Sequence, residues 1–435
     1  MVTTRALCIG MSLAPTWLSG EGWRSPDSGI DGLYSGALAV QTAKAAEAAH
    51  LDFVFLPDTL SLTVEPMAQS FGFASLDPTL LMASLAHQTR KIGLVTTIST
   101  TFGHPYHVAR QLMSLHWLSG GRAGWNIVTA LQGHENFGLD RMPDSAARYA
   151  RAAEFTAAVR ALWASFPAEA LIVDRAAGRF ADTARLGPAD HAGPDFRVKG
   201  PLNLPGFPGP RLPLVQAGAS GPGRDFAASV ADLVFAPTPD MEAALELRAD
   251  LSARAIGHGR APADLRLLPG LSLYLAPTRR EAEDLFHHTH SRLDPARRIA
   301  RFREATGLDL TDWPSDRPVT LADLPEPASP PKTQTHADLM RRMIARDAPL
   351  PEDLLSRPEL LSASHWQIVG TPEQACAEIR RWHAAGAIDG FICTPGGAPS
   401  SRDLALNELM PRLAEAGLFR KAYASDSFLG HLGSA

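Results

Sequence analysis

The sequence predicts an α/β fold, a TIM (β/α)8 barrel, and three observations carry this prediction. Short apolar runs alternate with helical patterns, which is the order expected of parallel strands joined by crossover helices. Eight strand-and-helix repeats occur, the number that closes a TIM barrel. The chain has 435 residues and is 45% hydrophobic, enough to build one large barrel core. A doubly wound sheet is the competing fold, because strand order cannot be read from a sequence.

The expected strands are short runs of aliphatic and aromatic residues. They cover Ala6–Met11, Phe53–Leu56, Ile92–Thr97, Arg122–Thr129, Leu214–Ala217, Leu233–Phe235, Leu267–Leu275 and Gly390–Cys393. The expected helices lie between the strands or after the last one. They cover Ala37–Ala49, Thr79–Gln88, His107–Leu118, Ala146–Trp163, Gly223–Val230, Met241–Ile256, Arg279–Arg292, Pro372–Ala385 and Asp403–Ala416.

Two long segments interrupt the repeat, so we expect one barrel domain over residues 1–435 with insertions at about 167–211 and 295–365. The first insertion is rich in Gly, Pro and Asp, and the second contains a Pro-rich stretch at 323–331. Loops of this length in a compact domain usually have a function. The second insertion follows the seventh strand, so we expect it to cover the site at the barrel mouth. The alternatives are a passive surface loop and an oligomer contact.

Composition narrows the class of protein. The chain carries 41 Lys and Arg against 46 Asp and Glu, a net charge of −5, with no long run of one sign. This balance argues against binding nucleic acid or an anionic membrane surface. No apolar segment reaches transmembrane length, no secretory leader is recognisable, and the three cysteines show no metal-site or disulfide spacing. We therefore expect a soluble, cytoplasmic protein without a metal site.

The candidate site residues come from the carboxyl ends of the expected strands, where TIM barrels carry their sites. Asp58, Thr97, Asn126 and Thr129 stand at or just past these ends. His104 and His134 follow shortly after. Hydroxyl and amide groups predominate, with neither paired carboxylates nor a histidine cluster. Such a set favours holding a planar polar cofactor over hydrolysis or metal chemistry.

A glycine-rich loop runs from Gln216 to Arg224 with the sequence Gln-Ala-Gly-Ala-Ser-Gly-Pro-Gly-Arg. A buried strand leads into this loop, and a helix follows it. Backbone N–H groups at a helix start, together with the Ser220 hydroxyl, can hold a phosphate. The alternative is an ordinary strand-to-helix turn in which Ser220 only caps the helix.

Several motifs in chain order extend the argument beyond this loop. Ser119–Thr129 reads Ser-Gly-Gly-Arg-Ala-Gly-Trp-Asn-Ile-Val-Thr, and further matches lie at Trp23-Arg24, 53–58, 136–138, Arg148-Tyr149, 370–373, 389–391 and 417–420. Taken together, the chain resembles the two-component flavin monooxygenases of the bacterial-luciferase-like superfamily. The most similar branch contains nitrilotriacetate, dibenzothiophene-sulfone and long-chain alkane monooxygenases. Two positions depart from this branch. Pro57 stands where the branch usually has Ala, and Ala130 stands where it often has Ser.

The resemblance implies a monooxygenase that uses reduced FMN and O2 to oxygenate a small organic substrate. It also implies a separate NAD(P)H-dependent flavin reductase as partner, and a homodimer or homotetramer. Two alternatives remain: a flavin-binding barrel without turnover, and a deazaflavin-dependent oxidoreductase on the same fold.

The resemblance also implies roles for individual residues. Asp58 would contact the isoalloxazine or ribityl region, and Thr97 and Asn126 the ring edge. Ribityl and phosphate contacts would come from Thr129, Tyr149, Gly218, Ala219 and Ser220. His104 and His134 would stand on the oxygen or substrate side, and His336 would reach the site only if the second insertion folds over it. Each has a structural alternative, such as a helix cap for Asp58, a turn cap for either loop histidine and core packing for Tyr149.

Overall fold

The computed structural model describes residues 5–218, 220–291, 295–325, 334–361 and 364–433. Its centre is a closed barrel of eight parallel strands, each paired with the next in chain order, and the last pairs with the first. The strands are β1 (Cys8–Ser12), β2 (Phe53–Phe55), β3 (Gly93–Ser99), β4 (Ala123–Val128), β9 (Leu214–Ala217), β10 (Leu233–Ala236), β11 (Arg266–Leu275) and β13 (Gly390–Pro395). The predicted TIM barrel is confirmed, and the doubly wound alternative is wrong.

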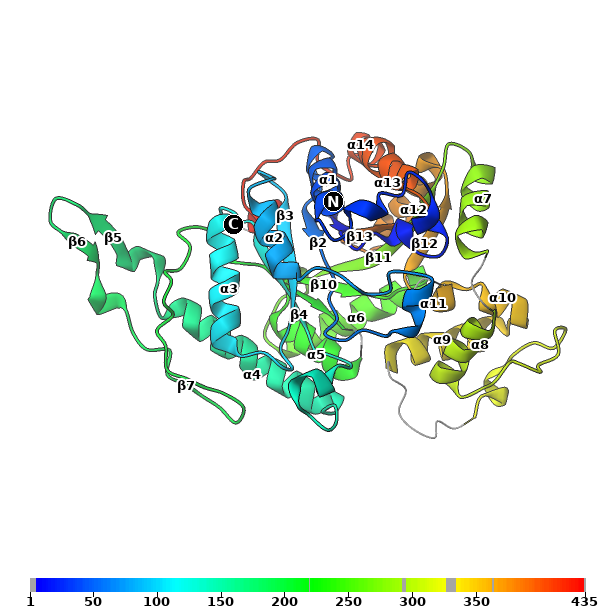
Figure 1. Ribbon diagram of the computed structural model, residues 1–435, viewed down its shortest axis with the longest axis horizontal. Helices are drawn as coiled ribbons and strands as arrows, with labels where there is room; N and C mark the ends of the chain where they lie inside the picture. Colours follow the sequence, from blue (N-terminus) through cyan, green and yellow to red (C-terminus); the bar gives the residue numbers. More distant parts are fainter. Residues whose placement is uncertain (1–4, 219, 292–294, 326–333, 362–363, 434–435) are drawn as a thin grey trace.

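Helices follow the strands and surround the barrel (Figure 1). They are α1 (Ala37–Ala48), α2 (Pro78–Ala86), α3 (Pro105–Leu118), α4 (Ser145–Ala164), α5 (Gly221–Val230), α6 (Met241–Gly257), α7 (Arg279–His290), α12 (Pro372–Ala384), α13 (Pro399–Leu404), α14 (Met410–Glu415) and α15 (Phe428–His431). Local signals set several starts. At α2, for example, Asp77 accepts the Leu80 N–H at 2.9 Å, and Pro78 occupies the first turn.

Two elements differ from the expected pattern. The helix expected over Asp403–Ala416 is divided, because a π-helical turn, η10 (Ala405–Leu409), separates α13 from α14. In addition, β12 (Trp366–Gly370) pairs in parallel with the second half of β11, from Leu271 to Leu275. This strand directly follows the second insertion, where no strand was expected. Trp366 fixes it by stacking on Trp382 of α12, with ring centroids 3.9 Å apart.

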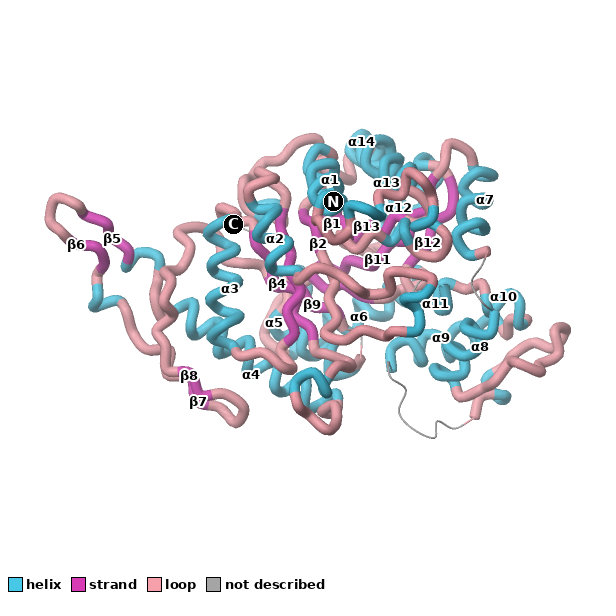
Figure 2. The backbone as a smooth tube through the Cα atoms, viewed as in Figure 1, coloured by secondary structure: helices cyan, strands magenta, loops and turns pink. Residues whose placement is uncertain are grey.

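The first insertion consists largely of two small antiparallel hairpins that project from the barrel (Figure 2). One joins β5 (Leu171–Asp174) to β6 (Arg179–Ala181), and the other joins β7 (His191–Ala192) to β8 (Arg197–Val198).

The second insertion is helical and has a hydrophobic cluster of its own. It contains α8 (Pro295–Thr306), α9 (Gln334–Asp347), α10 (Pro351–Leu355) and α11 (Pro358–Leu361), which lie together beside the barrel (Figure 1). Phe302, Met340 and Leu354 are among the buried residues of this cluster. The helical run expected from His336 to Ala345 lies within α9. Most of the Pro-rich stretch lies outside the described residues.

Candidate active site

A cavity of about 740 Å³ opens at the carboxyl ends of the barrel strands. Its wall includes the ends of β1 and β2, and side chains of β10, β11 and β13. Aliphatic and aromatic side chains such as Phe55, Phe235 and Ile392 form much of the wall. This cavity, called the barrel pocket below, occupies the place where TIM barrels carry their active sites.

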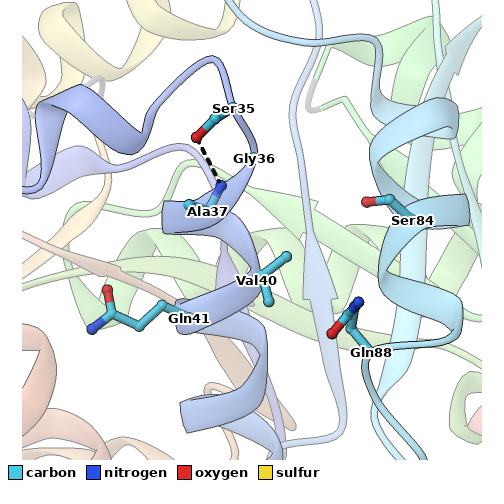
Figure 3. A pocket seen from close by; sticks show the side chains of 7 residues that line it. All are labelled: Ser35, Gly36, Ala37, Val40, Gln41, Ser84 and Gln88. Atoms are coloured by element: carbon cyan, nitrogen blue, oxygen red, sulfur yellow. Dashed lines mark hydrogen bonds between the residues drawn. The ribbon is translucent and has the colours of Figure 1, made fainter.

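A second hollow, of about 410 Å³, lies between α1 and α2 on the outside of the barrel (Figure 3). Ser35, Gln41, Ser84 and Gln88 supply its polar side chains, and no lining residue is charged. The Ser35 hydroxyl is engaged locally, because it accepts the Ala37 N–H at 3.4 Å. The barrel pocket is therefore the better candidate for chemistry.

Buried polar groups begin beside the pocket with a pair of residues on β3 and β4. Thr97 and Asn126 are register partners on these adjacent strands. The Thr97 hydroxyl donates to the Leu56 carbonyl at 2.6 Å and accepts from Asn126 Nδ2 at 3.0 Å. Asn126 is 1% exposed, and its Oδ1 has no hydrogen-bond partner among the described residues. A buried carbonyl without a partner is costly and points to a missing ligand group.

Gln216 on β9 continues this line of polar groups. It pairs in register with Ile127, the residue after Asn126. Its side chain is fully buried, and neither Nε2 nor Oε1 has a hydrogen-bond partner within the described part of the chain. The sequence places this residue at the start of the glycine-rich loop but predicts no role for its side chain. The structure thus adds an amide that can both donate and accept.

The glycine-rich loop completes the line at the start of α5. A Cβ on Gly218 would lie 2.6 Å from both Tyr149 Oη and Gln216 Nε2, and one on Gly223 would lie 2.7 Å from the same hydroxyl oxygen. The Tyr149 hydroxyl therefore packs against the loop, at a distance that only glycine at positions 218 and 223 permits. Ser220 caps α5 by accepting the Gly223 N–H at 3.3 Å. We call Asp58, Thr97, Asn126, Gln216 and Ser220 the polar row.

Asp58 follows β2 and lines the barrel pocket. Partial burial raises the pKa of its carboxyl to about 6, the Thr59 N–H opposes this rise, and the Asp77 carboxylate adds to it. The Thr97 hydroxyl donates to the carbonyl of Leu56, which is two residues before Asp58 in the chain. Asp58 therefore lies at the Thr97 end of the polar row. Thr129 is half-buried just past the end of β4.

The remaining sequence candidates are placed unevenly. His134 starts a short 3-10 turn, its Nδ1 is 3.2 Å from Glu135 Oε2, and nearby Gln132 lines the pocket. His104 is exposed and caps α3, its Nδ1 accepting the Tyr106 N–H at 3.2 Å, and it is not part of the pocket wall. Arg224 pairs with Asp250 at 3.1 Å. Ala219 lies outside the described residues.

Sequence reasoning missed several polar residues of the barrel pocket. Tyr274 and His290 come from β11 and α7, whereas Arg301 and His365 come from the second insertion. His365 packs on Phe235 with ring centroids 5.3 Å apart, and burial near His336 lowers its pKa to about 4. His365 thus lies in the pocket wall, whereas His336, which acts on its pKa, does not line the pocket. Only the folded path of the insertion reveals this, because these residues form no local motif.

Among the described residues, no three His, Cys, Asp or Glu side chains gather in a way that could hold a metal ion. No described helix has the length and apolar character needed to cross a bilayer.

Comparisons with known proteins agree with this geometry. The model of the luciferase-like monooxygenase family matches residues 23–388. The chain is 34% identical to dibenzothiophene-sulfone monooxygenase of Rhodococcus erythropolis, over 94% of this chain and 92% of that protein. It is 33% identical to nitrilotriacetate monooxygenase component A of Aminobacter aminovorans, over 95% and 93%. It is 32% identical to N-acetyl-S-(2-succino)cysteine monooxygenase of Bacillus subtilis (strain 168), over 98% and 96%.

Solved structures give the same result. A riboflavin lyase, solved with modified FMN and riboflavin, superposes with a TM-score of 0.84 at 28% identity, over 99% of this chain and 96% of that one. EDTA monooxygenase from Chelativorans sp. BNC1 superposes with a TM-score of 0.80 at 28% identity, over 99% of both chains. With a family model that spans most of the barrel and relatives that align along nearly their whole length, the chain belongs to the luciferase-like monooxygenases.

Proposed function

We propose that this chain is a flavin-dependent monooxygenase that binds reduced FMN and uses O2 to oxygenate a small organic substrate in the barrel pocket. The electrons come from a separate NAD(P)H-dependent flavin reductase. Family membership supports the reaction class, and the polar row supports the cofactor.

One observation carries the cofactor assignment. The carbonyl oxygen of Asn126 and both amide atoms of Gln216 are buried without hydrogen-bond partners within the described part of the chain. Unsatisfied amides in a barrel core are destabilising unless a bound group completes them. The edge of an isoalloxazine ring offers N–H donors and carbonyl or nitrogen acceptors, so both amides fit such a ring.

The loop at the start of α5 fits the other end of FMN. Gly218 and Gly223 allow the Tyr149 hydroxyl to pack directly against the loop, because a Cβ at either position would lie within 2.7 Å of its oxygen. We propose that this hydroxyl donates to the same ligand as the loop. The helix start contributes a positive dipole end and N–H groups, which suit a phosphate. Ser220 caps this helix, and its hydroxyl proton remains available for donation to a phosphate oxygen. The row thus matches FMN from ring to phosphate.

The residues of this chain bind and shield, whereas reduced FMN, when bound, supplies the reaction with O2. Asn126 and Gln216 orient the ring, and Ser220 with Tyr149 holds the phosphate. Asp58, with its pKa near 6, can hold or release a proton close to neutral pH. Arg301, Leu361 and His365 show that the second insertion forms part of the pocket wall. We propose that this wall keeps water from the reacting groups.

Names of relatives support a partner protein. One relative is component A of nitrilotriacetate monooxygenase, and two others are subunits A and B of pristinamycin IIA synthase of Streptomyces pristinaespiralis. We therefore propose that this chain also works with a second protein, and that this protein supplies its reduced flavin.

An anaerobic titration tests the cofactor assignment and separates it from its rivals. Reduced FMN and a reduced deazaflavin are each added to the purified chain, and binding is followed by flavin absorbance. We expect tight binding of reduced FMN. Preference for the deazaflavin would favour the oxidoreductase alternative.

A substrate screen with a generic flavin reductase then tests for turnover. Products are scored by mass for the gain of one oxygen atom. Binding of reduced FMN without any oxygenated product would favour a flavin-binding barrel without turnover.

A further inference from the structure

The barrel pocket combines an apolar wall with one cation. Phe55, Phe71, Leu81, Phe235 and Ile392 illustrate the wall. Of the described residues that line the pocket, Arg301 is the only Lys or Arg, and Asp58 is the only acid. An apolar cavity with a single cation is suited to an amphipathic ligand that carries one anionic group.

Arg301 is held in place by a backbone carbonyl of the second insertion. Its Nη1 donates to the Leu360 carbonyl at 2.8 Å, which anchors the guanidinium against α11. Burial lowers the pKa of Arg301, and the Glu304 carboxylate, three residues along α8, opposes this shift. Glu304 is not among the described residues that line the pocket. A guanidinium has five N–H donors in a planar fork, so most of them stay available.

Other arginines of the same insertion behave differently. Arg303, two residues along α8, pairs with Asp309 at 2.9 Å. Arg342 and Arg346 bind acidic residues of α6 and its cap, Glu246 at 2.8 Å and Asp240 at 2.6 Å. Of these four arginines, Arg301 is the one that lines the pocket.

The other polar groups beside the pocket do not compete for this role. His290 Nδ1 donates to the Phe286 carbonyl at 2.8 Å, so its Nε2 is the acceptor for Tyr274 Oη at 3.4 Å. Burial lowers the pKa of His290 and that of His365, so both rings are neutral at pH 7. Among the described residues that line the pocket, Arg301 and Asp58 are therefore the two charged groups at pH 7.

We propose that the substrate is an amphipathic carboxylate whose anionic group pairs with Arg301 while its apolar body fills the pocket. The planar fork of the guanidinium matches a carboxylate in a bidentate way. Asp58 repels the same group, so the carboxylate is directed toward the second insertion and the apolar end toward the polar row. This inference rests on the proposed function in taking the pocket as the substrate side of a flavin site.

Calorimetric titration with matched probes tests the proposal. The probes are 4-phenylbutanoate and octanoate, each compared with its primary amide, which has nearly the same shape and no charge. For the wild-type chain we expect each acid to bind roughly tenfold or more tightly than its amide. The preference should persist from pH 7 to 9, because Arg301 keeps its charge over this range.

Two variants assign the effect to Arg301. Arg301→Gln should abolish the preference for acids, while Arg303→Gln, on the same helix but outside the pocket wall, should keep it. Arg301→Lys should keep the preference at reduced affinity. Equal binding of acid and amide, no acid binding at millimolar concentration, or an unchanged preference in Arg301→Gln would each overturn the proposal.

The same samples separate this proposal from the proposed function. Reduced FMN is titrated into wild type and Arg301→Gln under anaerobic conditions, and we expect equal affinity. Loss of acid preference with FMN binding intact defines a substrate contact. Absence of FMN binding in the wild type would refute the flavin assignment whatever the acids do.

Discussion

Asn126 donates its Nδ2 hydrogen to the Thr97 hydroxyl at 3.0 Å, and this bond fixes the Asn126 carbonyl as the atom without a partner. Thr97 in turn donates its hydroxyl hydrogen to the Leu56 carbonyl, so the donor and the acceptor in each of these two hydrogen bonds are known. The carbonyl of Asn126 therefore stands ready to accept from a bound flavin.

Asn126→Leu should weaken reduced FMN binding about tenfold, since one buried hydrogen bond to the ring is lost. The free energy of unfolding should fall by only about 1 kcal/mol, because the Asn126 Nδ2 bond to Thr97 is lost whereas the removed carbonyl had no partner among the described residues. Anaerobic titration and urea unfolding measure the two quantities. Unchanged FMN affinity in the folded variant would remove Asn126 from the flavin site.

Ser220→Ala should weaken FMN binding by roughly 1–2 kcal/mol, the scale of a charge-assisted hydrogen bond. The same change removes the cap of α5, so a matched cap provides the control. Thr371 caps α12 by accepting the Gln374 N–H at 3.3 Å, away from the row. Thr371→Ala should lose comparable stability and keep full FMN affinity. If both variants bind FMN equally well, Ser220 is only a cap.

Gly218→Ala should also reduce FMN affinity, because the new Cβ would lie 2.6 Å from Tyr149 Oη and Gln216 Nε2 and must displace both. Gly221→Ala in the same loop is the control, since nothing lies within 4 Å of its Cβ position. Equilibrium dialysis with FMN compares the two. Equal affinities would show that Tyr149 and Gln216 do not hold the cofactor.

Asp58 should make stability depend on pH in a defined direction. Its folded pKa of about 6 exceeds the usual value of an exposed aspartate, so the folded chain binds the proton more tightly than the unfolded chain. Its contribution to stability is therefore most favourable below about pH 4, and it is lost as the pH rises through 6.

Urea unfolding of wild type and Asp58→Asn at pH 4.5 and pH 7 measures this effect. The variant should gain stability relative to wild type on going from pH 4.5 to 7. Buried Asp52, whose pKa is also raised to about 6, titrates in the same window in both proteins and cancels in the comparison. A stability difference that does not change with pH would show that burial does not perturb Asp58.

The barrel could be predicted from the sequence because each of its eight strands carries its own apolar run and most of the helices between them begin at a capping side chain or a proline. Thr97 and Asn126 were predictable as site candidates for a related reason, since they lie on strands whose carboxyl ends must meet at one face. Ser220 could be predicted as a phosphate contact from the pattern of the glycine-rich loop, and Tyr149 from the family resemblance.

Other features depend on contacts between distant segments. Gln216 is a candidate ligand only because its register beside β4 leaves its amide buried and unpaired. Arg301 and His365 reach the pocket through the path of the second insertion, which no local pattern encodes. His104 shows the opposite case, since a histidine just past a strand end is here an exposed helix cap.

Oxygen isotope incorporation tests the central claim most directly. The purified chain is incubated with FMN, NADH, a separate flavin reductase and a compound that gained an oxygen atom in the screen. The incubation takes place under an atmosphere of labelled O2. The account predicts one labelled oxygen atom in each product molecule, and neither NADH oxidation nor product when the reductase is left out. Label derived from water, or rapid NADH oxidation by this chain alone, would contradict it.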